Sequence, residues 1–362
     1  MNRSLTLIVA GDPAQLTGGY VYDARIAAAL RSQGWEVAVI GLGGSFPEPD
    51  AASARALDDA LAGQPDAARV VIDGLAMGGL PEIVARHGSR LDLTALVHHP
   101  LADETGLDDA QRARFTISET RALAAVRRVI ATSAFTARRL ADFAVAAERI
   151  SVIEPGVDPA PLAQSASMER DGAQRLLCVA TLIPRKGHDV LIDALARIKE
   201  PAWQCDCIGS LDRDLNHTRA LTAKLLQHGL GNRIRLLGEC DTKALSAAYH
   251  DADVFLLPSH YEGYGMVVSE ALARGLPVIT TTGGALTHTL PHDAGLAVPP
   301  GDVTALADAL RRWFDDPELR QRLRAGARRA RENLTDWSAA GMAFANALTD
   351  PSSLETVKRV SS

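Results

Sequence analysis

Short apolar runs recur along the chain, and stretches with helical spacing, such as Tyr22–Gln33 and Ile117–Arg127, separate them. Runs this short, bounded by turn residues, are typical of buried strands. In the first half we predict strands at Leu5–Ala10, Glu36–Gly41, Arg69–Asp73, Leu93–His98, Arg128–Thr132 and Ile150–Glu154. In the second half we predict them at Arg175–Thr181, Gln204–Ile208, Arg233–Leu237, Asp253–Leu257 and Pro277–Thr281. Such alternation predicts α/β architecture, with parallel sheets covered by helices on both faces.

The pattern occurs twice, on either side of a Pro- and Ala-rich segment, Pro155–Ala173. A chain of 362 residues has room for two domains. We therefore predict two doubly wound, Rossmann-like domains that face a central cleft. Their expected bounds are 1–160 and 161–336, followed by a last helix at 337–349 and a polar tail at 350–362. Ligands of such sheets bind at the carboxyl ends of the strands, so we expect the site in the cleft.

Composition narrows the class of protein. The formal net charge of −6 argues against general nucleic-acid binding. The first apolar run is too short for a signal peptide and is expected to be a strand, and no apolar run approaches the length of a membrane span. Cys205 and Cys207 share one face of a strand, but no second pair or His cluster completes a metal site. We interpret all four cysteines as buried, reduced thiols of a cytoplasmic protein.

The stretch DVFLLPSHYEGYGMVVSEALARGLPVITTTGG, Asp253–Gly284, carries the strongest chemical signal. A buried strand ends at Pro258, and a loop with two glycines leads into a helical pattern. Glycines before a helix let the backbone approach a ligand, and the free N–H groups attract an anion such as a phosphate. Two carboxylates, Glu262 and Glu270, lie on the order of 12 Å apart along a helix at its usual rise. This spacing suits a diphosphate ligand at the helix tip, although a solvated acid pair is the simpler interpretation of the spacing alone.

This stretch resembles the signature of the retaining family 4 glycosyltransferases, which have the GT-B fold. In that family two Glu separated by seven residues flank a Gly-aromatic-Gly loop, and a strand and a Gly-Gly turn follow. The matching residues here are Glu262, Gly263, Tyr264, Gly265, Glu270, Gly283 and Gly284. The resemblance runs from about Gly18 to Leu348. It implies an acceptor domain followed by a donor domain, a last helix that packs back on the first domain, and no cofactor or metal.

A turn with two cations opens the second domain. Arg185 and Lys186 stand between a strand and a helix, and two cations there suit a diphosphate. The resemblance implies that Lys186 contacts the diphosphate of the donor. The family usually carries a second cation five residues before that Lys, where this chain has Thr181. Whether Arg185 replaces it stays open.

Further donor-site positions rest on the resemblance. On local sequence Gly18 and Gly19 form a simple turn, and a lone His at a strand end, such as His98, is usually structural. The resemblance implies instead that the glycine loop lies beside the donor and that His98 touches the donor sugar. It also implies donor contacts at Gly238, Met266 and Val267. Asp212 and Asp214 are interpreted as loop residues and not as a metal-binding pair.

Seven Arg and a single acid, Glu119, lie in the region 111–139. The simpler interpretation puts these Arg on solvated helix faces. The alternative is a weak peripheral contact with a membrane or an anionic acceptor, which would place the protein at the inner face of the membrane.

We therefore predict a retaining, metal-independent hexosyltransferase that moves a sugar from a UDP- or GDP-sugar to a hydroxyl of a lipid, polysaccharide or small molecule. Lys186, Arg185 and the N–H groups of Gly265 and Met266 would stabilise the leaving diphosphate. In this hypothesis Glu262 holds the sugar, Glu270 binds the ribose, and His98 acts from the opposite domain on cleft closure. Glu262→Ala is expected to abolish transfer and leave the fold intact. The alternatives are a nucleotide-sugar epimerase of the same fold and a non-catalytic binding subunit, which the departure at Thr181 would favour.

Overall fold

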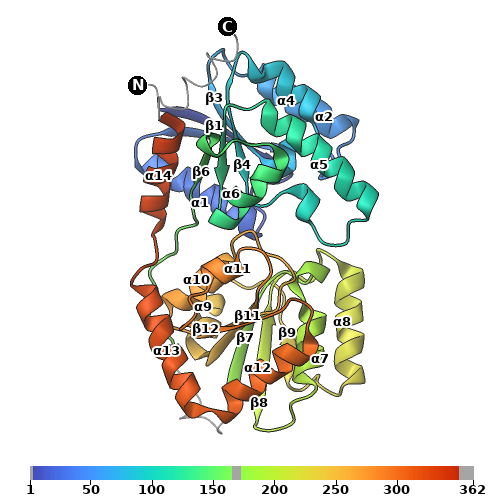
Figure 1. Cartoon of the computed structure of the whole chain (residues 1–362), viewed down its shortest axis with the longest axis vertical. Coiled ribbons are helices and arrows are strands. Elements are labelled where there is room, and N and C mark those ends of the chain that lie inside the picture. Colours follow the sequence, from blue (N-terminus) through green and yellow to red (C-terminus); the bar gives the residue numbers. More distant parts are fainter. Residues whose placement is uncertain (1–2, 165–172, 350–362) are drawn as a thin grey trace. The chain divides into compact units, whose positions relative to one another are not determined.

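The structure, a computed structural model, describes residues 3–164 and 173–349. It divides into two compact units, Met1–Gly156 with Thr335–Ser362 (unit 1) and Val157–Leu334 (unit 2) (Figure 1). The predicted tail at 350–362 lies outside the described residues, as do residues 165–172 of the predicted joint.

Unit 1 is built on a six-stranded parallel sheet with the order β2-β1-β3-β4-β5-β6. Its strands are β1 (Ser4–Ala10), β2 (Glu36–Leu42), β3 (Arg69–Asp73), β4 (Asp92–Val97), β5 (Arg128–Ala131) and β6 (Ile150–Val152). Its α-helices are α1 (Gly18–Ser32), α2 (Ala51–Ala62), α3 (Gly74–Met77), α4 (Pro81–Gly88), α5 (Asp109–Ala124), α6 (Ala134–Arg139) and α14 (Trp337–Thr349). Short 3₁₀ helices are η1 (Leu101–Asp103), η2 (Leu140–Phe143) and η3 (Ala147–Arg149).

Unit 2 is built on a second six-stranded parallel sheet, with the order β12-β11-β10-β7-β8-β9. Its strands are β7 (Gln174–Val179), β8 (Trp203–Ile208), β9 (Ile234–Leu236), β10 (Val254–Leu257), β11 (Val278–Thr281) and β12 (Gly295–Val298). Its helices are η5 (Pro184–Lys186), α7 (His188–Leu195), α8 (Leu215–Gln227), α9 (Thr242–Asp251), α10 (Met266–Ala273), α11 (Leu286–Thr289), α12 (Val303–Asp315) and α13 (Pro317–Arg331).

The strands follow the predicted apolar runs because both faces of a parallel sheet are covered. All four residues of β10 are buried, as are all four of β11. The sequence prediction missed β12, an edge strand whose four residues include Gly295 and Ala297, which are weak strand formers. It also started α5 too late, because a capping box between Asp108 and Gln111 begins this helix in a largely polar stretch before Phe115.

The last helix, α14, packs on α1 within unit 1. A Cβ at Gly341 would come within 2.6 Å of the Cβ of Ala29, so only glycine permits this approach of the two helices. The side chain of Gln33 donates to the carbonyl of Ser338 at 3.1 Å, and the rings of Tyr22 and Trp337 meet edge to face. These contacts join α14 to α1.

Candidate active site

Two turns meet at the carboxyl end of the sheet in unit 2. Strand β7 leads into η5, and its neighbour β10 leads into the loop 259–265. The N–H of His260 donates to the carbonyl of Arg185 at 2.8 Å, which joins the two turns directly. The strand order reverses between β7 and β10, and ligands of doubly wound sheets bind at such a switch point. The topology therefore places Lys186 and Glu262 where a ligand is expected.

Lys186 and Glu262 form a buried ion pair, with 2.6 Å between Nζ and Oε1. The hydroxyl of Ser259 donates to the same oxygen at 2.6 Å. Arg185 Nη1 lies 3.5 Å from Oε2 of Glu262 and donates to the carbonyl of Tyr261 at 2.8 Å. Only 6% of Glu262 is exposed, so the carboxylate has exchanged water for two cations and a hydroxyl.

The protonation of the Lys186–Glu262 pair follows from its surroundings. Burial by itself would raise the pKa of Glu262, but the charges of Lys186 and Arg185 and the bonds from Lys186 and Ser259 outweigh it and hold this pKa below its ordinary value. Burial lowers the pKa of Lys186, and the neighbouring carboxylate offsets only part of that effect. The arrangement keeps Glu262 ionised. The charged form of Lys186 is stable in this buried position only next to an anionic group.

Two glycines fix the backbone that carries Glu262. Gly284 has a φ of 64°, and a Cβ there would lie 2.2 Å from the carbonyl oxygen of Glu262. The N–H of Ala285 donates to that oxygen at 2.8 Å, and Glu262 forms an isolated parallel bridge with Gly284. Gly265, with a φ of 91°, makes the turn into α10. The Gly-Gly turn of the sequence motif thus clamps the loop that carries the first motif carboxylate.

Helix α10 begins at Met266 with no side chain bonded to its first N–H groups. The left-handed Gly265 precedes it, and a Cβ at that position would come within 2.8 Å of Leu286. N–H groups that no side chain caps, together with the helix dipole, attract an anion. The uncapped start of α10 supports the anion site expected at Gly265, Met266 and Val267, which stays a prediction.

The second motif carboxylate, Glu270, is oriented by the helix before it in the chain. Its Oε2 accepts from the hydroxyl of Tyr249 on α9 at 3.0 Å. Arg274 lies over the Tyr249 ring at 4.3 Å and donates to the carbonyl of Glu270 at 2.9 Å. Burial, and then the neighbouring carboxylate, raise the pKa of Tyr249 well above its ordinary value. Tyr249 therefore remains a hydrogen-bond donor to Glu270 across the neutral range.

In unit 1, His98 lies just beyond the end of β4, between two buried carboxylates. Its Nε2 is 3.2 Å from Asp23 on α1 and 3.3 Å from Asp73 at the end of β3. Burial alone would lower the pKa of His98, but the two carboxylates reverse the shift and raise the pKa to about 10. The ring packs against Gly19, where a Cβ would lie 3.2 Å from Cδ2. His98, with 19% of its side chain exposed, is thus an imidazolium at neutral pH.

The other predicted donor-site residues take separate places. Gly18 and Gly19 open α1 in unit 1 and do not form the simple turn that local sequence favours. Gly238 follows β9 in unit 2, where its carbonyl accepts from the N–H of Gly209 at 2.9 Å. Unit 2 alone brings Arg185, Lys186 and Glu262 into one cluster, with Gly263, Tyr264, Gly265, Met266, Val267 and Glu270 on the loop and helix that follow.

Sequence reasoning missed the side chains that orient the motif residues. Ser259 stands three positions before Glu262. A hydroxyl so close in sequence to a motif carboxylate could have been predicted to bond to it. Asp73 ends a predicted strand at the same edge of the sheet as His98, which the strand-end rule could have identified. Asp23 and Tyr249 lie within helices, and no local pattern distinguishes them from solvated or core positions.

The Arg-rich region 111–139 is largely engaged within unit 1. At least five of its seven Arg form ion pairs with acids, and these are Arg114 with Glu48, Arg121 with Glu82, Arg127 and Arg128 with Asp92, and Arg139 with Asp103 and Asp142. Among the described residues no helix is long and apolar enough to cross a membrane. A peripheral membrane contact through this region stays a prediction.

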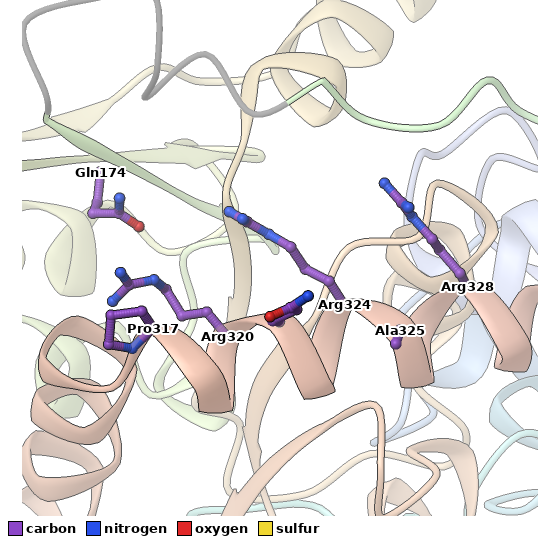
Figure 2. Close-up of a pocket in the computed structure, with 7 residues that line it drawn as sticks. Gln174, Pro317, Arg320, Arg324, Ala325 and Arg328 are labelled. Atoms are coloured by element: carbon purple, nitrogen blue, oxygen red, sulfur yellow. The ribbon is translucent and has the colours of Figure 1, made fainter.

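A cavity of about 600 Å³ lies elsewhere in unit 2, beside α13 and the start of β7. Figure 2 shows Arg320, Arg324 and Arg328 projecting from one side of α13, with Gln174 nearest to Arg320. Arg320 donates to the carbonyls of Trp313 and Phe314 at the end of α12, and Arg324 lies 3.2 Å from the buried Asp253. At least two of these guanidinium groups therefore hold α13 in place, at the opposite end of β7 from Lys186.

Two family models match the chain. "Glycosyltransferase Family 4" matches residues 17–161 and "Glycosyl transferases group 1" matches residues 163–330. An MMP alpha-(1->4)-mannosyltransferase of Mycolicibacterium hassiacum is 30% identical over 310 residues, which cover 81% of this chain and 72% of that protein. A glycogen synthase of Mycobacterium tuberculosis is 35% identical over 202 residues, 54% of this chain and 47% of that protein. The alignments thus span about half the length of the glycogen synthases and of a D-inositol 3-phosphate glycosyltransferase of Jonesia denitrificans.

Solved structures share the fold. The sucrose-phosphate synthase of Thermosynechococcus elongatus aligns with a TM-score of 0.79 at 23% identity, over 99% of this chain and 100% of that one. The Anabaena protein HepE, crystallised with UDP and glucose, aligns with a TM-score of 0.74 at 18% identity, over 95% of this chain and 99% of that one. Together with the two parallel sheets, these alignments confirm the predicted GT-B fold.

Proposed function

Since the chain belongs to glycosyltransferase family 4, we propose that it transfers a sugar from a nucleoside diphosphate sugar to an acceptor hydroxyl. The observation that carries the proposal is the Lys186–Glu262 pair at the switch point of unit 2, with an uncapped helix N-terminus directly after it. Cationic and N–H donors in this arrangement suit a diphosphate. The Glu262 carboxylate lies 2.6 Å from the Lys186 ammonium. If Lys186 binds the diphosphate, Glu262 is therefore close enough to bind the sugar that is attached to it.

In this mechanism the leaving diphosphate gains negative charge as the glycosidic bond to it breaks. Lys186, Arg185 and the first N–H groups of α10 stabilise that charge, and they do so in a site largely withdrawn from water. The diphosphate competes with Glu262 for Lys186, and a displaced Glu262 then accepts hydrogen bonds from the sugar hydroxyls. Glu270, held by Tyr249, accepts from the ribose hydroxyls.

On the resemblance alone, we also propose that His98 and the glycines of α1 contact the donor sugar. The imidazolium of His98 would donate a hydrogen bond to a sugar hydroxyl. From the resemblance we also propose that the transfer retains the anomeric configuration and that it needs no metal ion. Arg185 already reaches Glu262 and the loop carbonyl of Tyr261, which supports it as the second cation in place of the family position at Thr181.

For the donor we propose a UDP- or GDP-hexose. Anabaena HepE binds UDP and glucose in its crystal, and the M. hassiacum relative is named a mannosyltransferase. The relatives carry names for different acceptors, and we propose a hydroxyl of a lipid, a polysaccharide or a small molecule for this chain.

Calorimetric binding of UDP, GDP and ADP, each with and without EDTA, tests the site. We expect micromolar binding of one nucleotide that survives chelation, and loss of that binding in Lys186→Met. Lys224→Met is the matched control, because Lys224 forms a half-exposed pair with Asp193 on the same unit. Failure of all three nucleotides to bind would favour a non-catalytic binding subunit. A new sugar nucleotide formed without acceptor would favour an epimerase.

A further inference from the structure

Three buried side chains converge behind the turn that carries Lys186. Cys178 on β7 and Cys207 on β8 are register partners in neighbouring parallel strands, so their side chains leave the same face of the sheet. His188, the first residue of α7, brings its Nε2 to 3.7 Å from Sγ of Cys178. The two sulfur atoms and the imidazole nitrogen all lie within 4.8 Å of one another. Each of the three residues is at most 2% exposed.

The spacing of these atoms fits a tetrahedral metal ion. Typical zinc bonds to sulfur and to imidazole nitrogen place two such ligands about 3.6 Å apart at a tetrahedral angle, and two sulfurs about 3.8 Å apart. The 3.7 Å between Sγ of Cys178 and Nε2 of His188 agrees with the first value. An ion therefore needs only small movements of the side chains to bind all three.

The imidazole of His188 has no competing polar task among the described residues. Its Nε2 meets sulfur, and its Nδ1 is buried without a hydrogen-bond partner there. Burying a polar imidazole costs free energy, and weak contacts with thiols offset little of that cost. A bond from a ring nitrogen to a metal ion would offset more of it. The Nε2 of His217 is also buried without a partner in the described part of the chain, but His217 does not belong to this group of three ligand atoms.

Charge selects the kind of ion. A dication with two thiolates and one neutral imidazole is neutral overall, whereas a monovalent ion on the same ligands would leave a net negative charge in the core. Thiolate and imidazole donors favour zinc over magnesium or calcium, which prefer oxygen. We propose that Cys178, Cys207 and His188 bind one zinc ion that joins β7, β8 and the start of α7.

The proposed zinc is structural and does not depend on the proposed transfer reaction. Gly187 alone separates His188 from Lys186, so an ion held by His188 would fix the turn that presents this lysine. The ligands are fully buried and have no opening toward a substrate. This site also revises the interpretation of the cysteines from sequence. Cys178 and His188 complete a cluster with Cys207 that the pattern of Cys205 and Cys207 alone did not reveal.

Metal content measured by mass spectrometry on protein purified from zinc-supplemented medium tests the proposal. We expect about one zinc ion per chain. Cys207→Ser and His188→Asn are expected to retain less than about a tenth of it. Cys240→Ser is the control, because Cys240 is a free cysteine of the same unit that lies outside the cluster. Equal loss in Cys240→Ser would overturn the assignment.

A second measurement needs no variant that risks misfolding. The wild-type chain is produced with cobalt in place of zinc, and its near-ultraviolet absorption is recorded. Two thiolate ligands are expected to give sulfur-to-cobalt charge-transfer bands together with the visible bands of a tetrahedral ion. A chain that folds without bound zinc and shows no such bands with cobalt contains only a thiol–imidazole hydrogen bond at this position, and the proposal then fails.

Discussion

Glu262 and Lys186, 76 positions apart in the sequence, neutralise each other across 2.6 Å inside unit 2. Neither charge has enough water around it to be stable alone. The pair therefore has two effects. Each charge stabilises the other in the ligand-free protein, and Lys186 stays charged and able to bind an anionic ligand. This relationship changes what a mutation at Glu262 is expected to do.

Glu262→Ala is expected to abolish transfer and also to destabilise unit 2, in contrast to the intact fold expected from sequence. Removing one partner of a buried ion pair typically costs about 3–5 kcal/mol, because the other charge stays uncompensated. Urea unfolding monitored by circular dichroism measures this loss. Glu262→Gln keeps the shape and is expected to lose less stability while transfer still fails. Wild-type turnover in Glu262→Gln would contradict the assigned role.

The charge of His98 is expected to persist far above its ordinary range. Its folded pKa of about 10 lies above the ordinary 6.5, so the stability it contributes is fully present below pH 6.5 and is lost as the pH rises through about 10. Asp73→Asn removes one of the two carboxylates and is expected to lower this pKa. NMR titration of the imidazole proton signals measures the shift in each protein. A wild-type midpoint near 6.5 would show that the two carboxylates do not act on His98.

Glu119 is expected to make unit 1 less stable as the pH rises. Burial raises its pKa to about 7, although the N–H groups of Leu101 and Ala102 donate to it. The folded chain thus binds this proton more tightly than the unfolded chain, and stability falls between pH 4.5 and 7. Glu119→Gln is expected to flatten that part of the curve. The free energy of unfolding of both proteins at pH 5 and pH 8 gives the comparison, and equal slopes would contradict the prediction.

Gly284→Ala is expected to displace the loop that carries Glu262. The left-handed φ of 64° and the 2.2 Å approach to the Glu262 carbonyl leave no room for a methyl group. The expected loss of stability exceeds about 1 kcal/mol, with weaker nucleotide binding. Gly231→Ala is the control in the same unit, because no atom lies within 4 Å of a Cβ there. Thermal unfolding and calorimetry compare the two, and equal behaviour would show that the turn is not a clamp.

The sequence by itself determined the elements and the motif. Apolar runs located eleven of the twelve strands in the described part of the chain, because central strands of a sheet that is covered on both faces are apolar along most of their length. The spacing of Glu262, Gly265 and Glu270 identified the loop and the helix that follows it, because these features are local. Errors fell where local signals were weak, as at β12, or polar, as at the start of α5.

Only the tertiary structure decided which side chains meet. Lys186 reaches Glu262 because β7 and β10 are neighbours in the sheet, a pairing that depends on strand order and not on sequence distance. The same holds for Asp23 and Asp73 at His98, and for Cys178 and Cys207, which the register of β7 and β8 aligns. The protonation states of Glu262 and His98 depend on these contacts as well. Burial and neighbouring charges set a pKa, and both arise only when distant segments pack together.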